Sequence, residues 1–356
     1  MTSSLLLTLD YELFGDGSGD VFKHIVEPTN AILDVAECYG AKITVFFEVV
    51  EYWRLKQEWE SGNKMGYEHN PVEAMEQQVL DIIARGHDVQ LHIHPQWVDA
   101  KWNNGKWVVD LNNWRLGTFS SSSISLKQLI AEGKRTLEKL INPVFPNYEC
   151  LAIRAGGFNA QPSQEIVAAM RELGINFDSS IVPGGKEDGS LSVYDYTKLP
   201  NDIGFWFVDK KLEEPSQINT DIIELVHVSF PIMRLLKFLS LSRIRSILQN
   251  HKSAHASFSA KTAKSNWLQR LFNKLSFFFK KEYQTWDYCL FPNWLHRYFM
   301  RKVLKQTSRD LFVVIGHPKS LVSTQSLEYL LKKTNSRFNY PTISDLKDSL
   351  FNPIQN

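Results

Sequence analysis

Cysteine is scarce in this sequence, with three residues among 356: Cys38, Cys150 and Cys289. Their odd number and wide spacing argue against a disulfide framework and against a cysteine-based zinc ribbon. Long apolar runs are also missing, because no stretch reaches the roughly 20 apolar residues of a membrane-spanning helix. Neither sign of charge dominates, since 40 Lys and Arg stand against 39 Asp and Glu. We therefore expect no nucleic-acid partner.

What remains is the composition of an ordinary globular enzyme, with 43% hydrophobic and 22% charged residues. Barrel folds commonly reach this length as one domain, so we expect residues 1–356 to form a single unit. Residues 1–4 lack a basic segment, and the apolar run that follows reads as a strand rather than a signal peptide. The expected location is the cytoplasm.

Two histidines share one face of a predicted strand. In the run from Gly86 to Pro95, Val89, Leu91 and Ile93 alternate with polar residues, as in a strand with one apolar face. His92 and His94 then project from the same side, with Cβ atoms about 7 Å apart. A single divalent ion can bind both imidazoles if a carboxylate reaches it from elsewhere. An unremarkable polar strand face is the other interpretation.

A matching element stands at the N-terminus. The apolar run 5–9 predicts a buried central strand that ends in Asp10 and Glu12, two carboxylates at i and i+2. The carboxyl ends of parallel strands are where α/β proteins gather catalytic groups. One acid can bind a metal while the other accepts a proton.

Strands and helices alternate along the chain, which predicts a parallel sheet. Apolar residues at helical spacing predict four helices, and a further strand is expected after the first of them. The helices are expected over 28–39, 72–85 (closed by Gly86), 125–140 and 163–173 (with Ser163 as N-cap), and the strand over 43–49. Between Trp97 and Trp114, an Asn-Gly pair predicts a hairpin or long loop.

Six segments, in order, resemble the motifs of the polysaccharide deacetylase family (the NodB homology domain). The N-terminal motif is followed by a second strand, a metal-histidine motif, an arginine motif, a Asp-Ser-Ser segment and a final strand ending in histidine. They are Leu7–Glu12, Lys42–Phe47, Gly86–His92, Ile153–Phe158, Gly174–Ser180 and Val313–Pro318. The resemblance implies a distorted (β/α) barrel of seven strands.

The resemblance also implies roles for single residues. Asp10 is the expected general base, Arg154 its ion-pair partner, and His317 the general acid, with Asp178 either orienting His317 or capping a turn. Glu12, His92 and His94 are the expected ligands of a divalent metal ion, with zinc as the favoured ion.

Two departures from the family pattern bear on the metal site. Tyr11 stands where the second acid usually follows, and that acid is displaced to Glu12. Gln96 stands where the second metal histidine usually lies, and a neutral amide is a poor zinc ligand. His94 is the obvious replacement, but the sequence leaves open which residue completes the site.

Expected substrate contacts are Tyr11, Trp97, Gly156, Gly157 and Phe158. Aromatic rings stack on sugar faces, and Trp97, Trp102, Trp107 and Trp114 follow the metal motif directly. The other interpretation is that these rings only pack the loop onto the barrel.

A basic stretch interrupts the C-terminal half. Residues 225–281 contain eleven Lys and Arg and no acid, and aromatic residues recur at helical spacing from Trp267 to Phe279. We expect a basic helical insertion over 232–310. Such a helix either lies peripherally on an anionic membrane or packs on the barrel with its aromatic face in the core.

The resemblance thus implies a metal-dependent sugar N-deacetylase of surface-glycan biosynthesis. A cytoplasmic location implies as partner an acetylated sugar, or a lipid- or nucleotide-linked saccharide. The oligomeric state is not predicted. Two alternatives remain: an amide hydrolase for non-sugar substrates on the same barrel, and a saccharide-binding relative that lost activity with the change to Gln96.

Overall fold

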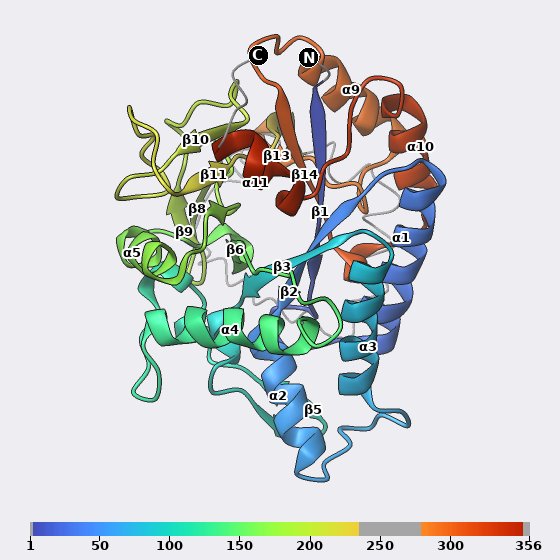
Figure 1. The fold of residues 1–356 in the computed structure, drawn as a ribbon, viewed down its shortest axis with the longest axis vertical. Coiled ribbons are helices and arrows are strands. Elements are labelled where there is room, and N and C mark those ends of the chain that lie inside the picture. Colours follow the sequence, from blue (N-terminus) through green and yellow to red (C-terminus); the bar gives the residue numbers. More distant parts are fainter. Residues whose placement is uncertain (1–2, 235–278, 352–356) are drawn as a thin grey trace, which may run out of the picture.

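The computed structural model describes residues 3–234 and 279–351, which form an α/β barrel (Figure 1). Within these residues seven parallel strands make up the barrel wall, with β10 (Phe205–Phe207) antiparallel at one edge. In spatial order the parallel strands are β11 (Ile223–Leu225), β7 (Phe177–Asp178), β6 (Ala152–Ala155), β3 (Asp88–Ile93), β2 (Ile43–Glu48), β1 (Ser4–Tyr11) and β14 (Leu311–Gly316).

Single bridges close the barrel between β11 and β14. His227, just beyond β11, pairs in parallel with Val313, and Asp287 pairs with Ile315 one pleat further along β14. The backbone N–H of Val228 donates to the carbonyl of Val313 at 2.9 Å. The predicted seven-strand distorted barrel is therefore confirmed.

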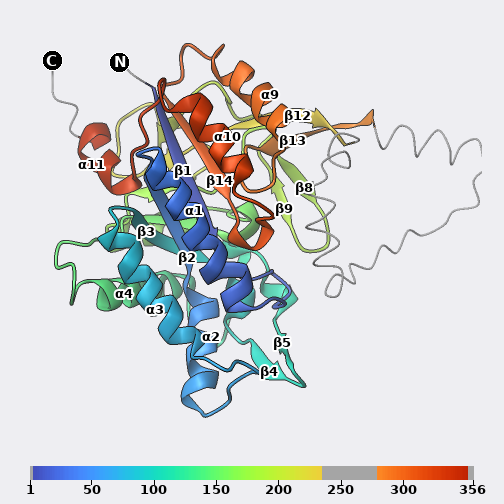
Figure 2. The same ribbon diagram turned by 90° about the vertical axis from the view of Figure 1, so that its right-hand side faces the viewer.

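Helices cover the outside of the sheet, and α1 and α3 lie in front of it in Figure 2. The described helices are α1 (Glu27–Cys38), α2 (Val49–Glu60), α3 (Pro71–Ala84), α4 (Leu126–Ile141), α5 (Gln164–Leu173), α9 (Asn293–Val303), α10 (Gln325–Thr334) and α11 (Ile343–Phe351). None of them is long and apolar enough to cross a membrane, as far as the described residues go.

The four helices predicted from periodicity lie within one residue of their expected ends. Helix α4 begins with a capping box between Ser125 and Gln128, and α3 is closed by Gly86 at φ 82°. Ser163 is the N-cap residue of α5 as expected, but its hydroxyl donates to Glu213 and accepts from the backbone N–H of Leu212 rather than capping the helix. Helix α2 was not predicted, because it follows β2 with no loop: Glu48 ends the strand and caps the helix.

Three short antiparallel ribbons project from the connections. They are β4–β5 (Lys101–Asn103 with Lys106–Val108), β8–β9 (Lys186–Asp188 with Val193–Asp195) and β12–β13 (Ser229–Met233 with Lys281–Thr285). The first is the hairpin expected from its Asn-Gly pair, and both turn residues have positive φ. Within the expected insertion 232–310, the described residues include strand β13 and helix α9, whereas the basic segment 267–278 lies outside the described residues.

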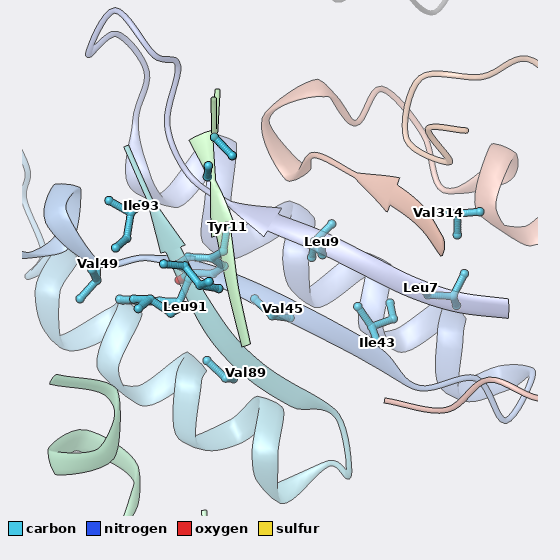
Figure 3. Packing of buried hydrophobic residues seen from close by; sticks show 14 of the residues in the cluster. Leu7, Leu9, Tyr11, Ile43, Val45, Val49, Val89, Leu91, Ile93 and Val314 are labelled. Carbon is cyan, nitrogen blue, oxygen red and sulfur yellow. The ribbon is translucent and has the colours of Figure 1, made fainter. Parts of the chain in front are cut away.

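Two layers of apolar side chains follow from the alternation of the strands. Leu5, Leu7, Leu9 and Tyr11 of β1 point outward into the large core beneath the helices. Figure 3 shows this layer continuing through Ile43, Val45, Val89 and Leu91 of the neighbouring strands. Inward-facing residues form a second, smaller cluster inside the barrel: Leu6, Phe46, Ala152, Phe177, Ile223 and Val313.

Helix α11 closes the amino end of the barrel. Its Ile343 and Leu346 belong to the inner cluster, and the backbone and hydroxyl of Ser344 both donate to Asp88 at the start of β3, at 3.2 and 3.0 Å. With the floor plugged by apolar residues, the inward-facing polar residues gather at the other end of the strands.

Arg309 reinforces the closure and generates a stability prediction. Its buried guanidinium donates to the carbonyls of Val226 (2.6 Å), Leu311 (2.8 Å) and Asn201 (3.1 Å). Arg309→Met would leave these carbonyls unpaired, so we expect a loss of about 2–4 kcal/mol in the free energy of unfolding. Urea denaturation measures it. Arg297→Met on the exposed face of α9 is the control. Equal stability of both variants would contradict a stabilising role for the Arg309 hydrogen bonds.

Candidate active site

The polar residues singled out in the sequence meet at the carboxyl ends of four barrel strands. Asp10 lies on β1 and Glu12 directly after it, His92 lies on β3 and His94 directly after it, and Arg154 lies on β6; His317 is the residue after β14. All but His317 are at most 5% exposed. The period-two alternation of β1 and β3 explains why each strand presents two of these side chains on the inner face.

Asp10 is held by Arg154. Arg154 Nη1 donates to Asp10 Oδ1 at 2.5 Å, and its Nε and Nη2 donate to the carbonyl and hydroxyl of Ser179, each at 2.9 Å. Burial alone would raise the pKa of Asp10, but Arg154, with His92 and His317, lowers it below its ordinary value. Asp10 is therefore an ionised carboxylate that can accept a proton at Oδ2.

Glu12, His92 and His94 converge on one point. The Glu12 Oε2 atom lies 3.3 Å from His92 Nε2 and 2.5 Å from His94 Nε2. Burial opposes ionisation of Glu12, but Lys319 and His94 lower its pKa well below the ordinary value. One carboxylate oxygen and two imidazole nitrogens within 4.8 Å of one another are a donor set that suits zinc.

The hydrogen bonds around the histidines test whether a cation fits. His92 Nδ1–H donates to the carbonyl of Arg154 at 2.9 Å, which leaves the lone pair on Nε2. That nitrogen is buried, has no hydrogen-bond partner and faces a carboxylate oxygen. Two facing lone pairs repel unless a proton or a metal ion lies between them, and with His94 as a third donor the residues present fit a bound divalent ion.

Gln96 is placed behind His94 rather than in the ligand set. Its Nε2 lies 2.9 Å from His94 Nδ1, while its Oε1 is buried without a partner. A His94 ring that accepts at Nδ1 keeps its proton on Nε2. Metal binding at Nε2 requires the amide to turn so that Oε1 accepts from Nδ1–H. His94 faces Glu12, and Gln96 contacts the far side of its ring, so this geometry favours His94 over Gln96 as the third ligand.

His317 faces Asp10 from the end of the neighbouring strand β14. Its Nε2 lies 3.7 Å from Asp10 Oδ2, and its Nδ1 lies 2.9 Å from Asp287 Oδ2. Burial would lower the pKa of His317, but the hydrogen bond and charge of Asp287 raise it overall. A protonated imidazole beside the base is the arrangement of a general acid.

Asp287 corrects the expectation for Asp178. Asp178 lies on β7 and accepts from the backbone and hydroxyl of Ser180, at 2.8 and 3.0 Å, so it caps a turn. Burial raises the pKa of Asp178 although its hydrogen bonds with Glu224 and Ser180 lower it, and Asp287 takes the place beside His317. No sequence pattern marks Asp287, because it pairs with β14 through one isolated bridge.

Lys319 is a second site residue that sequence reasoning missed. Its Nζ donates to Glu12 Oε1 at 2.7 Å and to the carbonyl of Leu13 at 2.8 Å. It therefore neutralises the Glu12 oxygen that faces away from the histidines. Its position two residues after His317 was the only available signal.

Two expected substrate contacts are wrong. Tyr11 points into the outer core, where its ring stacks on Phe47 and its hydroxyl donates to Gln78 at 2.8 Å. The strand alternation that turns Asp10 and Glu12 inward turns Tyr11 outward. Trp97 is 1% exposed and packs edge-on against Trp107, so it fixes the loop to the barrel.

The loop after β6 borders the site. A Cβ on Gly156 would lie 2.5 Å from His94 Nδ1, so this glycine makes room for the His94 ring. Gly157 is exposed, and Phe158 is half-buried against His227. Among the four tryptophans, Trp114 contacts a candidate ligand, with its ring centroid 6.3 Å from that of His94. Contact of Gly156, Gly157 and Phe158 with substrate stays a prediction.

Comparison with known proteins gives likeness in fold only. No protein-family model matches the chain, and a search of curated proteins finds no significant match. Similar solved structures include a polysaccharide deacetylase from Bacillus cereus (9% identity, TM-score 0.38, covering 96% of this chain and 91% of the other). Puue allantoinase follows at 11% identity, TM-score 0.44 and coverage of 96% and 88%. A GH57-type branching enzyme from Pyrococcus horikoshii has 10% identity, TM-score 0.47 and coverage of 98% and 70%.

The ligand geometry predicts how zinc affinity responds to substitution. We expect His94→Ala to weaken zinc binding by well over tenfold, and Gln96→Leu to weaken it by about tenfold because the ring loses its orienting partner. Isothermal titration with zinc measures both. His69→Ala, an exposed histidine before α3, should bind zinc as the unaltered protein does. Unchanged affinity in His94→Ala would remove His94 from the ligand set.

Proposed function

We propose that this protein is a metal-dependent hydrolase that removes the N-acetyl group from a sugar during surface-glycan precursor biosynthesis. The observation that carries the proposal is the division of the site into two parts. Glu12, His92 and His94 form a donor set with two imidazoles, while Asp10 lies outside it, paired with Arg154, in a second group that shares Glu12 and includes His317.

Hydrolysis of an acetamide needs a deprotonated water, a polarised carbonyl and a proton for the departing amine. A bound divalent ion, with zinc the best match to the donors, supplies Lewis acidity towards water and carbonyl. Asp10 accepts the proton of the attacking water at Oδ2. Arg154 keeps the other oxygen, Oδ1, occupied and the carboxylate in place. His317 delivers a proton to the leaving nitrogen, and Asp287 holds its Nδ1–H.

The proposed substrate is an acetylated saccharide, free or linked to a nucleotide or lipid carrier. A cytoplasmic enzyme meets such sugars before export. The proposed contact with an anionic membrane depends on the basic segment 267–278, which lies outside the described residues. Sedimentation with anionic liposomes at low and high salt tests that contact, since electrostatic binding weakens as salt rises.

Acetate release tests the proposed reaction. The purified protein, loaded with zinc, is incubated with acetylated monosaccharides, oligosaccharides and sugar nucleotides, and with cyclic amides. Release of acetate and a free amine from a sugar supports the proposal. Hydrolysis of a cyclic amide alone would identify a non-sugar amide hydrolase, and zinc-binding protein without any turnover would favour a saccharide-binding relative.

The division of roles predicts the behaviour of Asp10→Asn. The asparagine oxygen still accepts from Arg154, so the fold and the zinc affinity should change little. Turnover should fall by about 10²–10⁴-fold, because an amide does not accept the water proton. Zinc titration and acetate release are measured on the same preparation. A folded Asp10→Asn variant that no longer binds zinc would make Asp10 a ligand and exchange its role with that of Glu12.

The Asp287–His317 pair predicts a change in pH dependence. Because Asp287 raises the pKa of His317, the protonated acid persists to higher pH than for an isolated histidine. In Asp287→Asn that pKa falls, so the alkaline limb of kcat/KM should move to lower pH and the maximal rate should fall at least about tenfold. Asp345→Asn, on the exposed face of α11, is the control. An unmoved alkaline limb would mean that His317 is not the acid.

A further inference from the structure

A cavity beside the general acid is built from uncharged residues. It has a volume of about 350 Å³, and Trp294, Phe291, Pro292, Val322, Asn293 and Gln325 are among the residues that line it. We refer to it as the Trp294 cavity. Its volume lies within the range of about 300–1,000 Å³ typical of small-molecule sites.

The Trp294 cavity shares a wall with the candidate active site. Cys289, which also lines it, is two residues from Asp287, and its backbone N–H donates to Asp287 Oδ1 at 2.8 Å. On the opposite side, Val322 follows His317 and Lys319 on the loop after β14. The cavity wall is therefore connected to His317 through Cys289 and Asp287.

The lining has the chemistry of a surface for neutral sugars. Trp294 is 40% exposed, although a large apolar ring is normally buried. Asn293 and Gln325 are exposed amides at its edge, and Ser323 adds a hydroxyl. An aromatic ring packs against the C–H face of a pyranose, and amides and hydroxyls bond its OH groups. No lining residue is charged.

Two other cavities of the described residues differ in this respect. The cavity near β8–β9, of about 510 Å³, is lined by seven charged residues, among them Lys186, Asp195 and Lys211. The cavity of about 560 Å³ at the amino end of the barrel includes Lys42 and Asp345 and lies at the opposite end from Asp10. Neither combines an exposed tryptophan with an uncharged lining.

We propose that the Trp294 cavity is a subsite for a neutral sugar ring, with Trp294 as its stacking platform. It binds the part of an oligosaccharide that continues from the sugar at the active site. This inference rests on the proposed function for its connection with catalysis. It favours an oligosaccharide substrate over a single sugar, and it disfavours an anionic saccharide at this position.

An array of neutral and anionic mono- to hexasaccharides tests the subsite without any turnover. The full-length protein should bind neutral oligosaccharides, and Trp294→Ala should bind them at least about tenfold more weakly, as expected for the loss of one large buried contact. Trp294→Phe should retain most of the binding. Leu304→Ala, an exposed apolar residue at the other end of α9, is the matched control and should bind as the unaltered protein does.

The outcomes separate this inference from the proposed reaction. Neutral-glycan binding lost in Trp294→Ala, without acetate release from any sugar, supports the subsite and overturns the deacetylase. Acetate release with equal glycan binding by Trp294→Ala and the unaltered protein overturns the subsite alone. Binding of anionic glycans only, or of no glycan, also overturns it. If both hold, Trp294→Ala should raise KM for an acetylated oligosaccharide about tenfold while leaving kcat on an acetylated monosaccharide unchanged.

Discussion

The buried ion pair between Arg154 and Asp10 is the interaction on which the carboxyl end of the barrel depends. Arg154 has no exposed surface, lies 3.9 Å above the Phe46 ring and directs its donors to β1 and to the segment after β7. Removing one member of such a pair typically costs 3–5 kcal/mol, because the other charge stays buried. Arg154 thus connects β6 with β1 and with the end of β7. It also holds the Asp10 carboxylate in its place between His92 and His317.

Around this pair, neighbouring groups tune each acid and base differently. Asp10 and Glu12 are both buried, yet cations lower the pKa of each, Arg154 for the first and Lys319 for the second. Asp287 raises the pKa of His317, whereas burial lowers the pKa of His94. Two carboxylates kept ionised, one histidine poised to carry a proton and another kept neutral make a site with separate roles for similar side chains.

Much of the site could be predicted from the alternation of side chains along each strand, and the wrong prediction for Tyr11 ignored that alternation. The alternation in β1 and β3 predicted that Asp10 and Glu12 share a face, as do His92 and His94. The same rule places Tyr11 on the outer face, where it bonds Gln78, although we expected it to contact substrate. Asp287 and Lys319 gave no usable signal, since one lies in a segment joined by a single bridge and the other follows His317 in a short turn.

The sequence by itself determined which side chains of each strand face inward and where four of the outer helices begin and end, because both are properties of a few consecutive residues. Only the tertiary structure decided which inward residues meet. Asp10 lies 144 residues from Arg154, and His317 faces Asp287 rather than Asp178. Such pairings depend on strand register and on how the barrel closes between β11 and β14, and no local period encodes either one.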